Sequence, residues 1–124
     1  MNKPKKNKMT LKRKILGNKG EELALQHLEN KGFVLIGQNI RLFCGEIDLL
    51  MQDKKELVIV EVKTKSDTSF GFAAEMITYK KKRKLLQLAK ALTQKFPKRN
   101  IRIDVVAVDE ENIEHIESAV EENI

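Results

Sequence analysis

The spacing of apolar residues in the first half of the chain predicts one helix followed by three strands. After Asn18, apolar side chains recur at helical intervals until Gly32, so a helix is expected over about 19–31. Segments rich in β-branched and aliphatic residues follow, and the last two are joined by a polar turn at 53–56. The expected strands cover residues 33–41, 46–52 and 57–64. This half of the chain is therefore expected to form one helix and a meander.

The second half combines one long helix with two further strands. Thr78 provides an N-cap for a helix that ends near Phe96, because Pro97 cannot continue it. The run 101–108 is typical of a buried strand, and 112–119 of an edge strand. The inward stripe of the helix is expected to contain Lys81, Leu85, Leu88 and Leu92.

The order of these elements predicts the fold class. An αβββαβ order is typical of an α/β protein with a mixed central sheet flanked by helices. The long helix would cross over the sheet and return the fourth strand parallel to the third. The segment 66–73, which contains Gly71, is expected to be a loop.

The length and composition of the chain are those of a single domain. With 124 residues, of which 41% are hydrophobic, the chain can build one core but not two. Residues 1–16 are expected to be a flexible basic arm, because they are highly charged and offer few apolar side chains. The domain itself is expected over 17–120, followed by a short acidic tail over 121–124.

The cysteine count and the hydropathy of the chain indicate the compartment in which the protein is expected to act. Cys44 is the single cysteine, so no disulfide can form within the chain, and no paired cysteine and histidine spacing suggests a zinc site. Neither a secretory signal nor a membrane-spanning stretch is evident. We therefore expect a soluble, cytoplasmic protein that acts without a membrane.

The net charge of +6 is distributed unevenly along the chain. Residues 1–14 carry seven basic and no acidic side chains, whereas seven acidic side chains and no Lys or Arg follow from Asp109 onward. Such clusters predict a polyanionic partner, nucleic acid above all, although a solvated helix face explains any one run equally well. With five Phe, one Tyr and no Trp, a stacking platform for single strands is not obvious. The middle of the chain is basic as well and contains the run Lys80, Lys81, Lys82, Arg83 and Lys84.

Four charged residues interrupt strands that should be apolar. Glu46 and Asp48 share one face of their strand, and Glu61 and Lys63 share a face of the next. If the turn at 53–56 pairs these strands, Asp48 and Glu61 converge, and a hard divalent ion such as Mg²⁺ or Mn²⁺ would relieve their repulsion. Lys63 would then stabilise charge on a phosphoryl group, or help to position or deprotonate the attacking water. The alternative is a buried ion pair of Lys63 with Glu61 or Asp48.

Two side chains on the predicted helices extend this cluster. Glu21 lies on the stripe that packs against the sheet, so it would complete a metal site; alternatively it belongs to a capping box at the start of its helix. Lys81 would direct an ammonium group at a phosphate, or extend along the helix surface to solvent. Asp104 is expected to be structural, paired with Arg102 or Lys63.

Together these residues form a pattern that resembles the YraN family, an uncharacterised bacterial family. Its core is similar to Holliday-junction resolvases within the PD-(D/E)XK nuclease superfamily. The resemblance covers about 17–120, and the motifs are specific in combination. They are Gly17-x-x-Gly20-Glu21-x-x-Ala24, Gly45-Glu46-Ile47-Asp48-Leu49-Leu50, Val60-Glu61-Val62-Lys63, Lys81 and Arg102-Ile103-Asp104-Val105-Val106.

The resemblance implies a restriction-endonuclease-like fold and a metal-dependent endonuclease that hydrolyses DNA phosphodiester bonds, with branched or structured DNA as the expected substrate. It implies Glu21, Asp48 and Glu61 as ligands of Mg²⁺ or Mn²⁺, and Lys63 as the catalytic lysine that completes the catalytic set. Glu46 belongs to the motif, but its role is open. The alternative is a non-catalytic nucleic-acid-binding protein that retains the nuclease fold.

One departure from the family pattern concerns phosphate binding. Family members often have arginine two places after the motif lysine, where this chain has Lys65. Lysine keeps the charge but loses bidentate binding, so we expect Lys65 to contact nucleic acid, together with the run 80–84, without a tight clamp. Resolvase-like relatives act as dimers, which makes a homodimer a candidate state, although no isolated apolar helix face requires one.

Overall fold

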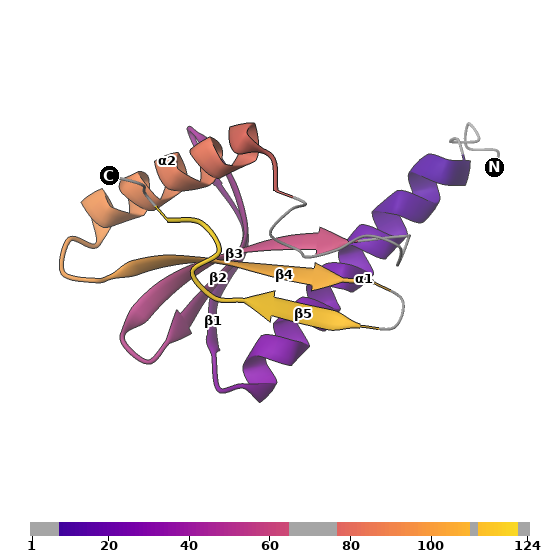
Figure 1. Cartoon of the computed structure of the whole chain (residues 1–124), viewed down its shortest axis with the longest axis horizontal. Helices are drawn as coiled ribbons and strands as arrows, with labels where there is room; N and C mark the ends of the chain where they lie inside the picture. Colours follow the sequence, from indigo (N-terminus) through magenta and orange to yellow (C-terminus); the bar gives the residue numbers. More distant parts are fainter. Residues whose placement is uncertain (1–7, 65–76, 110–111, 122–124) are drawn as a thin grey trace, which may run out of the picture.

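The protein is a five-stranded mixed sheet with one helix on each face (Figure 1). The structure, a computed structural model, describes residues 8–64, 77–109 and 112–121, with side chains from Lys19 onward. This is the α/β arrangement that the element order predicted, and it is consistent with a restriction-endonuclease-like core. The elements are α1 (Lys8–Asn30), β1 (Val34–Leu42), β2 (Gly45–Asp53), β3 (Glu56–Thr64), α2 (Tyr79–Lys95), β4 (Ile101–Val108) and β5 (Ile113–Ile116).

The strands lie in the sheet in the same order as in the chain. The pairs β1–β2 and β2–β3 are antiparallel, which confirms the meander. The pair β3–β4 is parallel, as expected for strands joined through a crossover helix, and β5 closes the edge antiparallel to β4. The central strands β3 and β4 therefore have neighbours on both sides.

Helix α2 agrees with its prediction. Thr78 is its N-cap, and the hydroxyl oxygen accepts a hydrogen bond from the Lys81 amide at 3.1 Å. Phe96 is its C-cap, just before Pro97. The predicted inward leucines are all buried, namely Leu85, Leu88 and Leu92.

Helix α1 is longer than predicted, because it begins at Lys8 and not near Lys19. It thus extends into the segment that we expected to be a flexible arm. Lys, Leu and Arg are good helix formers, and neither proline nor glycine interrupts 8–16. A capping box at Asn18 is therefore wrong, since that residue lies inside the helix. The predicted end is confirmed: Gly32 has a φ of 96°, a left-handed conformation that favours glycine after a helix.

The last strand and two of the predicted irregular segments complete the comparison with the sequence. The expected edge strand over 112–119 is shorter than predicted, because Ser118 adopts a left-handed φ of 51° soon after β5. The predicted loop at 66–73 and most of the predicted tail lie outside the described residues. Of the helices that the structure describes, none has the length and apolar character needed to cross a membrane.

The apolar core has two layers, one on each face of the sheet. The layer under α1 includes Ala24 and Leu28, and the layer under α2 includes Leu85, Leu88 and Leu92. Because the central strands are buried on both faces, any polar side chain within them needs a partner.

Asp104 on β4 is such a side chain, with no exposed surface. Its carboxylate accepts two hydrogen bonds from the Arg102 guanidinium, each 2.9 Å long, and one from the Ser118 amide at 3.0 Å. The His115 Nε2 lies 2.7 Å from Asp104 Oδ2. Burial raises the pKa of Asp104, but the hydrogen bonds from His115, Arg102 and Ser118 outweigh it, and the pKa falls below its usual value. The expected pairing with Arg102 is confirmed.

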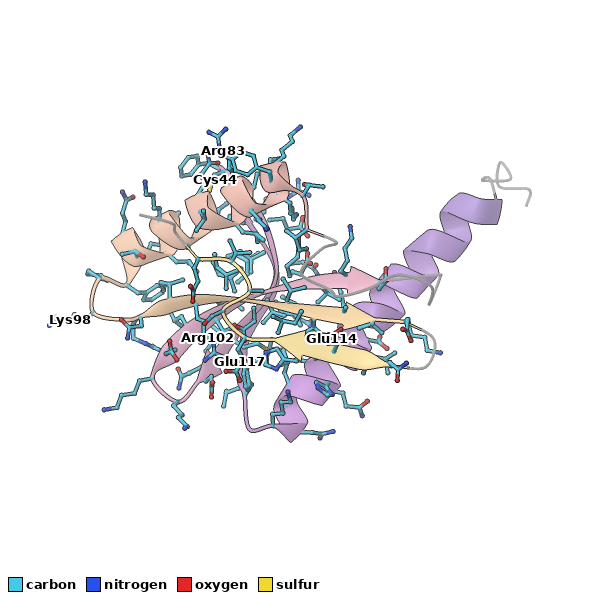
Figure 2. The ribbon with its side chains drawn as sticks, in the orientation of Figure 1. Cys44, Arg83, Lys98, Arg102, Glu114 and Glu117 are labelled. Atoms are coloured by element: carbon cyan, nitrogen blue, oxygen red, sulfur yellow. The ribbon has the colours of Figure 1, made fainter. Side chains whose placement is uncertain are left out.

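Arg102 carries this network across the sheet. Its Nη1 lies 3.0 Å from an Asp53 oxygen and 3.1 Å from a Glu56 oxygen. These two residues flank the β2–β3 turn, since Asp53 ends β2 and Glu56 begins β3. Figure 2 shows Arg102 close to Glu117, near the end of β5. One guanidinium therefore ties the turn, β4 and the segment after β5 together.

Candidate functional site

Strands β2 and β3 separate midway, and the fork between them holds the predicted acidic residues. The ladder runs from the turn only as far as the pair Leu49 and Val60. Beyond that pair, β2 continues beside β1 and β3 continues beside β4, and Figure 1 shows the β1–β2 hairpin rising toward α2. The Val62 amide donates a hydrogen bond to Asp48 Oδ2 at 3.0 Å. Asp48 thus bridges the fork with its side chain.

Asp48 and Glu61 meet at the mouth of this fork. Continuing the ladder by one pair would place them opposite each other, and their carboxyl groups are in hydrogen-bonding contact. The Glu61 side chain is only 8% exposed. Burial, the hydrogen bond with Asp48 and the Asp48 charge raise the pKa of Glu61 to about 7. The expected convergence of the two carboxylates is confirmed, and its electrostatic cost appears as the raised pKa of Glu61.

Lys81 is the ion-pair partner of Glu61. Its Nζ lies 3.0 Å from Glu61 Oε2, and its charge opposes part of the rise in the Glu61 pKa. The buried Lys63 ion pair that the sequence allowed is wrong: Lys63 is exposed, and it makes no ion pair with any described residue. Because Lys63 is two positions from Glu61 on β3, it lies on the same face of the sheet. Its side chain is therefore exposed on the face that carries Glu61.

Glu21 approaches the fork from α1. Burial, the charge of Asp48 and the charge of Glu46 raise the pKa of Glu21, and a hydrogen bond with Asn39 opposes that rise. The hydrogen bond with Asn39 and the influence of the Asp48 charge agree with the inward helical position that the sequence predicted for Glu21. Its position well inside α1 excludes the capping role.

Asn39 is a residue of this site that the sequence did not identify. It lies between the pairs Gln38–Leu49 and Ile40–Ile47, so the register places it opposite Asp48, and it has a left-handed φ of 50°. The available signal was the sequence Gly37-Gln38-Asn39, because glycine and asparagine within a strand indicate a bulge or bend. The β1–β2 register does shift beside Gly37.

Glu46 occupies the outer part of the hairpin. It pairs across the two strands with Arg41, and their side chains lie 3.6 Å apart with exposures of 41% and 85%. An exposed pair of this kind contributes little to stability. Its clearest effect on the site is to raise the pKa of Glu21.

The carboxylates at the fork consist of a contacting pair and a third group nearby. In the part of the chain that the structure describes, no three acidic, histidine or cysteine side chains are close enough to hold one metal ion together. Asp48 and Glu61 are in contact, whereas Glu21 acts on Asp48 through its charge.

Gly20 determines how closely α1 lies against the sheet. A Cβ at this position would overlap Cγ2 of Thr64, at the end of β3. Only glycine permits this approach without a shift, and the next residue in the helix is Glu21. The close contact therefore contributes to the position of Glu21 at the fork.

We expect Gly20→Ala to lower the free energy of unfolding by about 1–3 kcal/mol, the usual effect of overpacking. In a Thr64→Ser background the effect should change sign, because the remaining neighbours lie at 3.6 and 4.0 Å and are ordinary contacts. Alanine then stabilises the helix by up to about 1 kcal/mol relative to glycine. Urea denaturation of the four proteins in this cycle measures both effects, and an equal loss in both backgrounds would contradict the packing explanation.

The basic run at the start of α2 surrounds the helix instead of forming one patch. Successive residues of a helix are about 100° apart, so five in sequence lie on all its sides. The other predicted contact, Lys65, lies outside the described residues. Lys81 contacts Glu61, Lys82 and Arg83 line a cavity of about 540 Å³, and Lys80 and Lys84 are exposed.

Comparison with known proteins gives the family of the chain. A model described as uncharacterised protein family UPF0102 matches residues 20–108. The chain belongs to the UPF0102 family. This confirms the resemblance to the YraN family, since the two names denote one family. The match includes every carboxylate at the fork as well as Lys63 and Lys81, so the UPF0102 domain contains the whole candidate site.

Relatives in the UPF0102 family cover most of the chain. The UPF0102 protein of Persephonella marina is 36% identical over 107 residues, which is 85% of this chain and 92% of the relative. That of Thermodesulfovibrio yellowstonii is 38% identical over 108 residues, 84% of this chain and 94% of the relative. A Vibrio campbellii relative is 43% identical over 113 residues, 86% and 93% of the two chains. The family is described as uncharacterised, so its name assigns no activity.

Proposed function

We propose that this UPF0102 protein is a metal-dependent nuclease that hydrolyses DNA phosphodiester bonds at the β2–β3 fork. The observation that carries the proposal is the contact between the Asp48 and Glu61 carboxyl groups in a largely buried position. Such a pair opposes folding, because burial and mutual repulsion both disfavour its charge. Carboxylates perturbed in this way are candidates for functional groups.

The donor set at the fork fits a hard divalent cation. Asp48 and Glu61 would hold Mg²⁺ or Mn²⁺, with Glu21 as the third ligand, since all three offer carboxylate oxygens. When bound, such an ion supplies a Lewis acid for the phosphoryl oxygens and acidifies a water molecule. The Val62 amide orients the Asp48 carboxylate through its hydrogen bond, as ligands of a metal site are usually oriented by a second group.

Two lysines would act on the phosphate in different ways. Lys63 is exposed on the face that carries Glu61, so its ammonium group would stabilise the negative charge that develops on phosphorus-bound oxygens, or hold the attacking water. Lys81 neutralises Glu61 in the free protein. Once another cation neutralises Glu61, Lys81 becomes available to the DNA backbone.

The distribution of positive charge on α2 supports DNA as the substrate. Helix N-termini favour anions, yet the first turn of α2 contains no acidic side chain and the run 80–84 is entirely basic. A bound phosphate backbone would relieve this repulsion. Because the cations lie on several sides of the helix, branched or structured DNA suits them better than one straight duplex. Phosphate contacts of this kind carry little base sequence information.

One observation favours a second candidate, a non-catalytic nucleic-acid-binding protein with a nuclease fold. Lys81 already neutralises Glu61 at 3.0 Å, and the described residues form no complete three-ligand cluster. A fold can keep such a site while its basic surface binds DNA without cutting it.

Cleavage assays separate the two candidates. The full chain is incubated with Mg²⁺ or Mn²⁺ and with duplex, flap and four-way-junction DNA. A nuclease should cut at least one of them, and Lys63→Ala should lower the rate by about 100-fold or more. Lys98→Ala, an exposed lysine between α2 and β4 (Figure 2), is the matched control and should cut like wild type.

Two results would decide against the nuclease. Either wild type cuts none of these substrates, or Lys63→Ala cuts as fast as wild type. Binding without cleavage that weakens steeply with salt would support the binding protein instead. Calorimetry adds an independent test of the ion: titrating Mn²⁺ into wild type should release or absorb heat, and Asp48→Asn should remove that heat.

A further inference from the structure

Phe43 is an aromatic side chain that the fold does not use. It is 97% exposed, the highest value among the large apolar side chains that the structure describes. With Cys44 it forms the two-residue turn between β1 and β2. Such turns usually consist of glycine, asparagine, aspartate or serine, and the β2–β3 turn of this protein is likewise polar over 53–56. Neither packing nor turn formation therefore accounts for a phenylalanine at this tip.

The turn that carries Phe43 is held in place. Leu42 and Cys44 both pack against the apolar core under α2. The backbone at Gly45 is also close to the helix, since a Cβ there would lie 3.7 Å from Leu88. The packed neighbours present Phe43 to solvent from a fixed position.

Charged side chains lie near Phe43 in the hairpin and on the helix that the turn packs against. Arg41, two residues before it, has an 85% exposed side chain 3.6 Å from Glu46, and α2 carries the basic run 80–84. A protein interface needs a wider apolar surface than one side chain, and both chain neighbours of Phe43 pack inward. An aromatic ring among cations suits unstacked nucleobases, because the ring stacks on a base while the cations bind its phosphates.

We propose that Phe43 stacks on an unpaired or unstacked nucleobase, and so directs the protein to DNA in which base stacking is interrupted. This inference rests on the proposed function and specifies its substrate class. Phe43 precedes Asp48 by five residues, so the ring and the fork belong to the same hairpin. In continuous duplex both faces of a base are covered by its neighbours, whereas a branch, flap or single strand leaves one face open.

Binding without cleavage tests this inference. Wild type, Phe43→Ala and Phe96→Ala are titrated in EDTA with a four-way junction, a single strand and a continuous duplex of equal length. Phe43→Ala should bind the junction and the single strand about tenfold or more weakly, and the duplex less than about twofold more weakly. Phe96, 42% exposed at the far end of α2, is the matched control, and its substitution should change none of the three affinities.

A second variant gives a direct signal of stacking. The chain contains no tryptophan, so Phe43→Trp introduces a single indole whose fluorescence reports on this position alone. Its emission should be quenched by the junction and the single strand but not by the duplex, and its affinities should follow wild type.

Each failure has a distinct meaning. The stacking role would be overturned if Phe43→Ala weakened binding of all three DNAs equally, or if no DNA quenched Phe43→Trp. It would also be overturned if ultracentrifugation showed that Phe43→Ala has a different oligomeric state from wild type, because Phe43 would then mediate contact between two copies. If Phe43→Ala still prefers the junction and the single strand to the duplex as strongly as wild type does, this inference is wrong and the proposed function is unaffected. If wild type binds none of the DNAs at low salt, the proposed function falls with it.

Discussion

We expect Glu61→Gln to cut DNA at least about 100-fold more slowly than wild type, and yet to be the more stable protein at about pH 8 without divalent ions. Glutamine keeps the shape of the side chain but removes the charge that a metal ligand needs and that burial beside Asp48 disfavours. Lys81 loses its ion pair, but its side chain is 42% exposed and can be solvated instead. Cleavage rates and urea denaturation in EDTA measure the two effects on the same preparation.

The stability of wild type should depend on pH through the same side chain. The pKa of Glu61 is raised from its usual 4.5 to about 7. Between these values the folded protein holds a proton that the unfolded chain has released, so stability falls as pH rises through this window. The loss is no more than about 3 kcal/mol. Glu61→Gln should remove most of this dependence, whereas Asp104, whose pKa is lowered, affects stability only in more acidic solution.

Glu29→Gln is the matched control for these experiments. Its side chain is exposed in the last turn of α1, eight residues after Glu21, so the substitution should leave both the rate and the pH dependence close to wild type. A Glu61→Gln protein that keeps the full pH dependence would show that another group is responsible. One that is less stable than wild type at about pH 8 would show that the Lys81 ion pair outweighs the repulsion.

The largest effect on folding is expected from Asp104→Ala, with a loss of about 3–5 kcal/mol in the free energy of unfolding. The substitution leaves the Arg102 guanidinium, 11% exposed, and the His115 ring, 1% exposed, without their buried partner. Since domains of this size are stable by about 5–15 kcal/mol, much of the protein would unfold at modest urea concentration. Urea denaturation followed by circular dichroism measures the loss.

Asp53→Ala serves as the comparison for Asp104→Ala. Asp53 contacts the same guanidinium at 3.0 Å, but its side chain is 23% exposed and Arg102 keeps its bonds to Asp104. A loss of about 1 kcal/mol or less is expected for this partly exposed contact. Similar losses for the two variants would mean that burial of Asp104 does not determine the strength of the network.

Most elements of the fold were predictable because each had a local signal. The strands are runs of β-branched residues, and α2 has an N-cap at Thr78 and a proline just after its end. The beginning of α1 was not predictable in the same way. Asn18 and Glu21 match a capping pattern, but a helix continues through such a pattern when the preceding residues, 8–16 here, also favour helix.

The candidate site was predictable only in part, for a geometrical reason. Spacing within a strand shows which side chains share a face, and the turn at 53–56 sets the register that joins Asp48 to Glu61. Spacing does not show which group arrives from another element. Lys81, and not Lys63, pairs with Glu61, and Asn39 reaches Glu21 from β1. The roles of these residues in metal binding and catalysis stay predictions.

The fork also gives the site a mechanical property. Asp48 belongs to the hairpin and Glu61 to the central sheet, so their spacing depends on the angle between the two about the last ladder pair, Leu49 and Val60. The tip of the hairpin is held against the core under α2 through Leu42 and Cys44, so this packing fixes the angle at its base. A substitution that loosens the tip would thus change the spacing of the carboxylates without touching them.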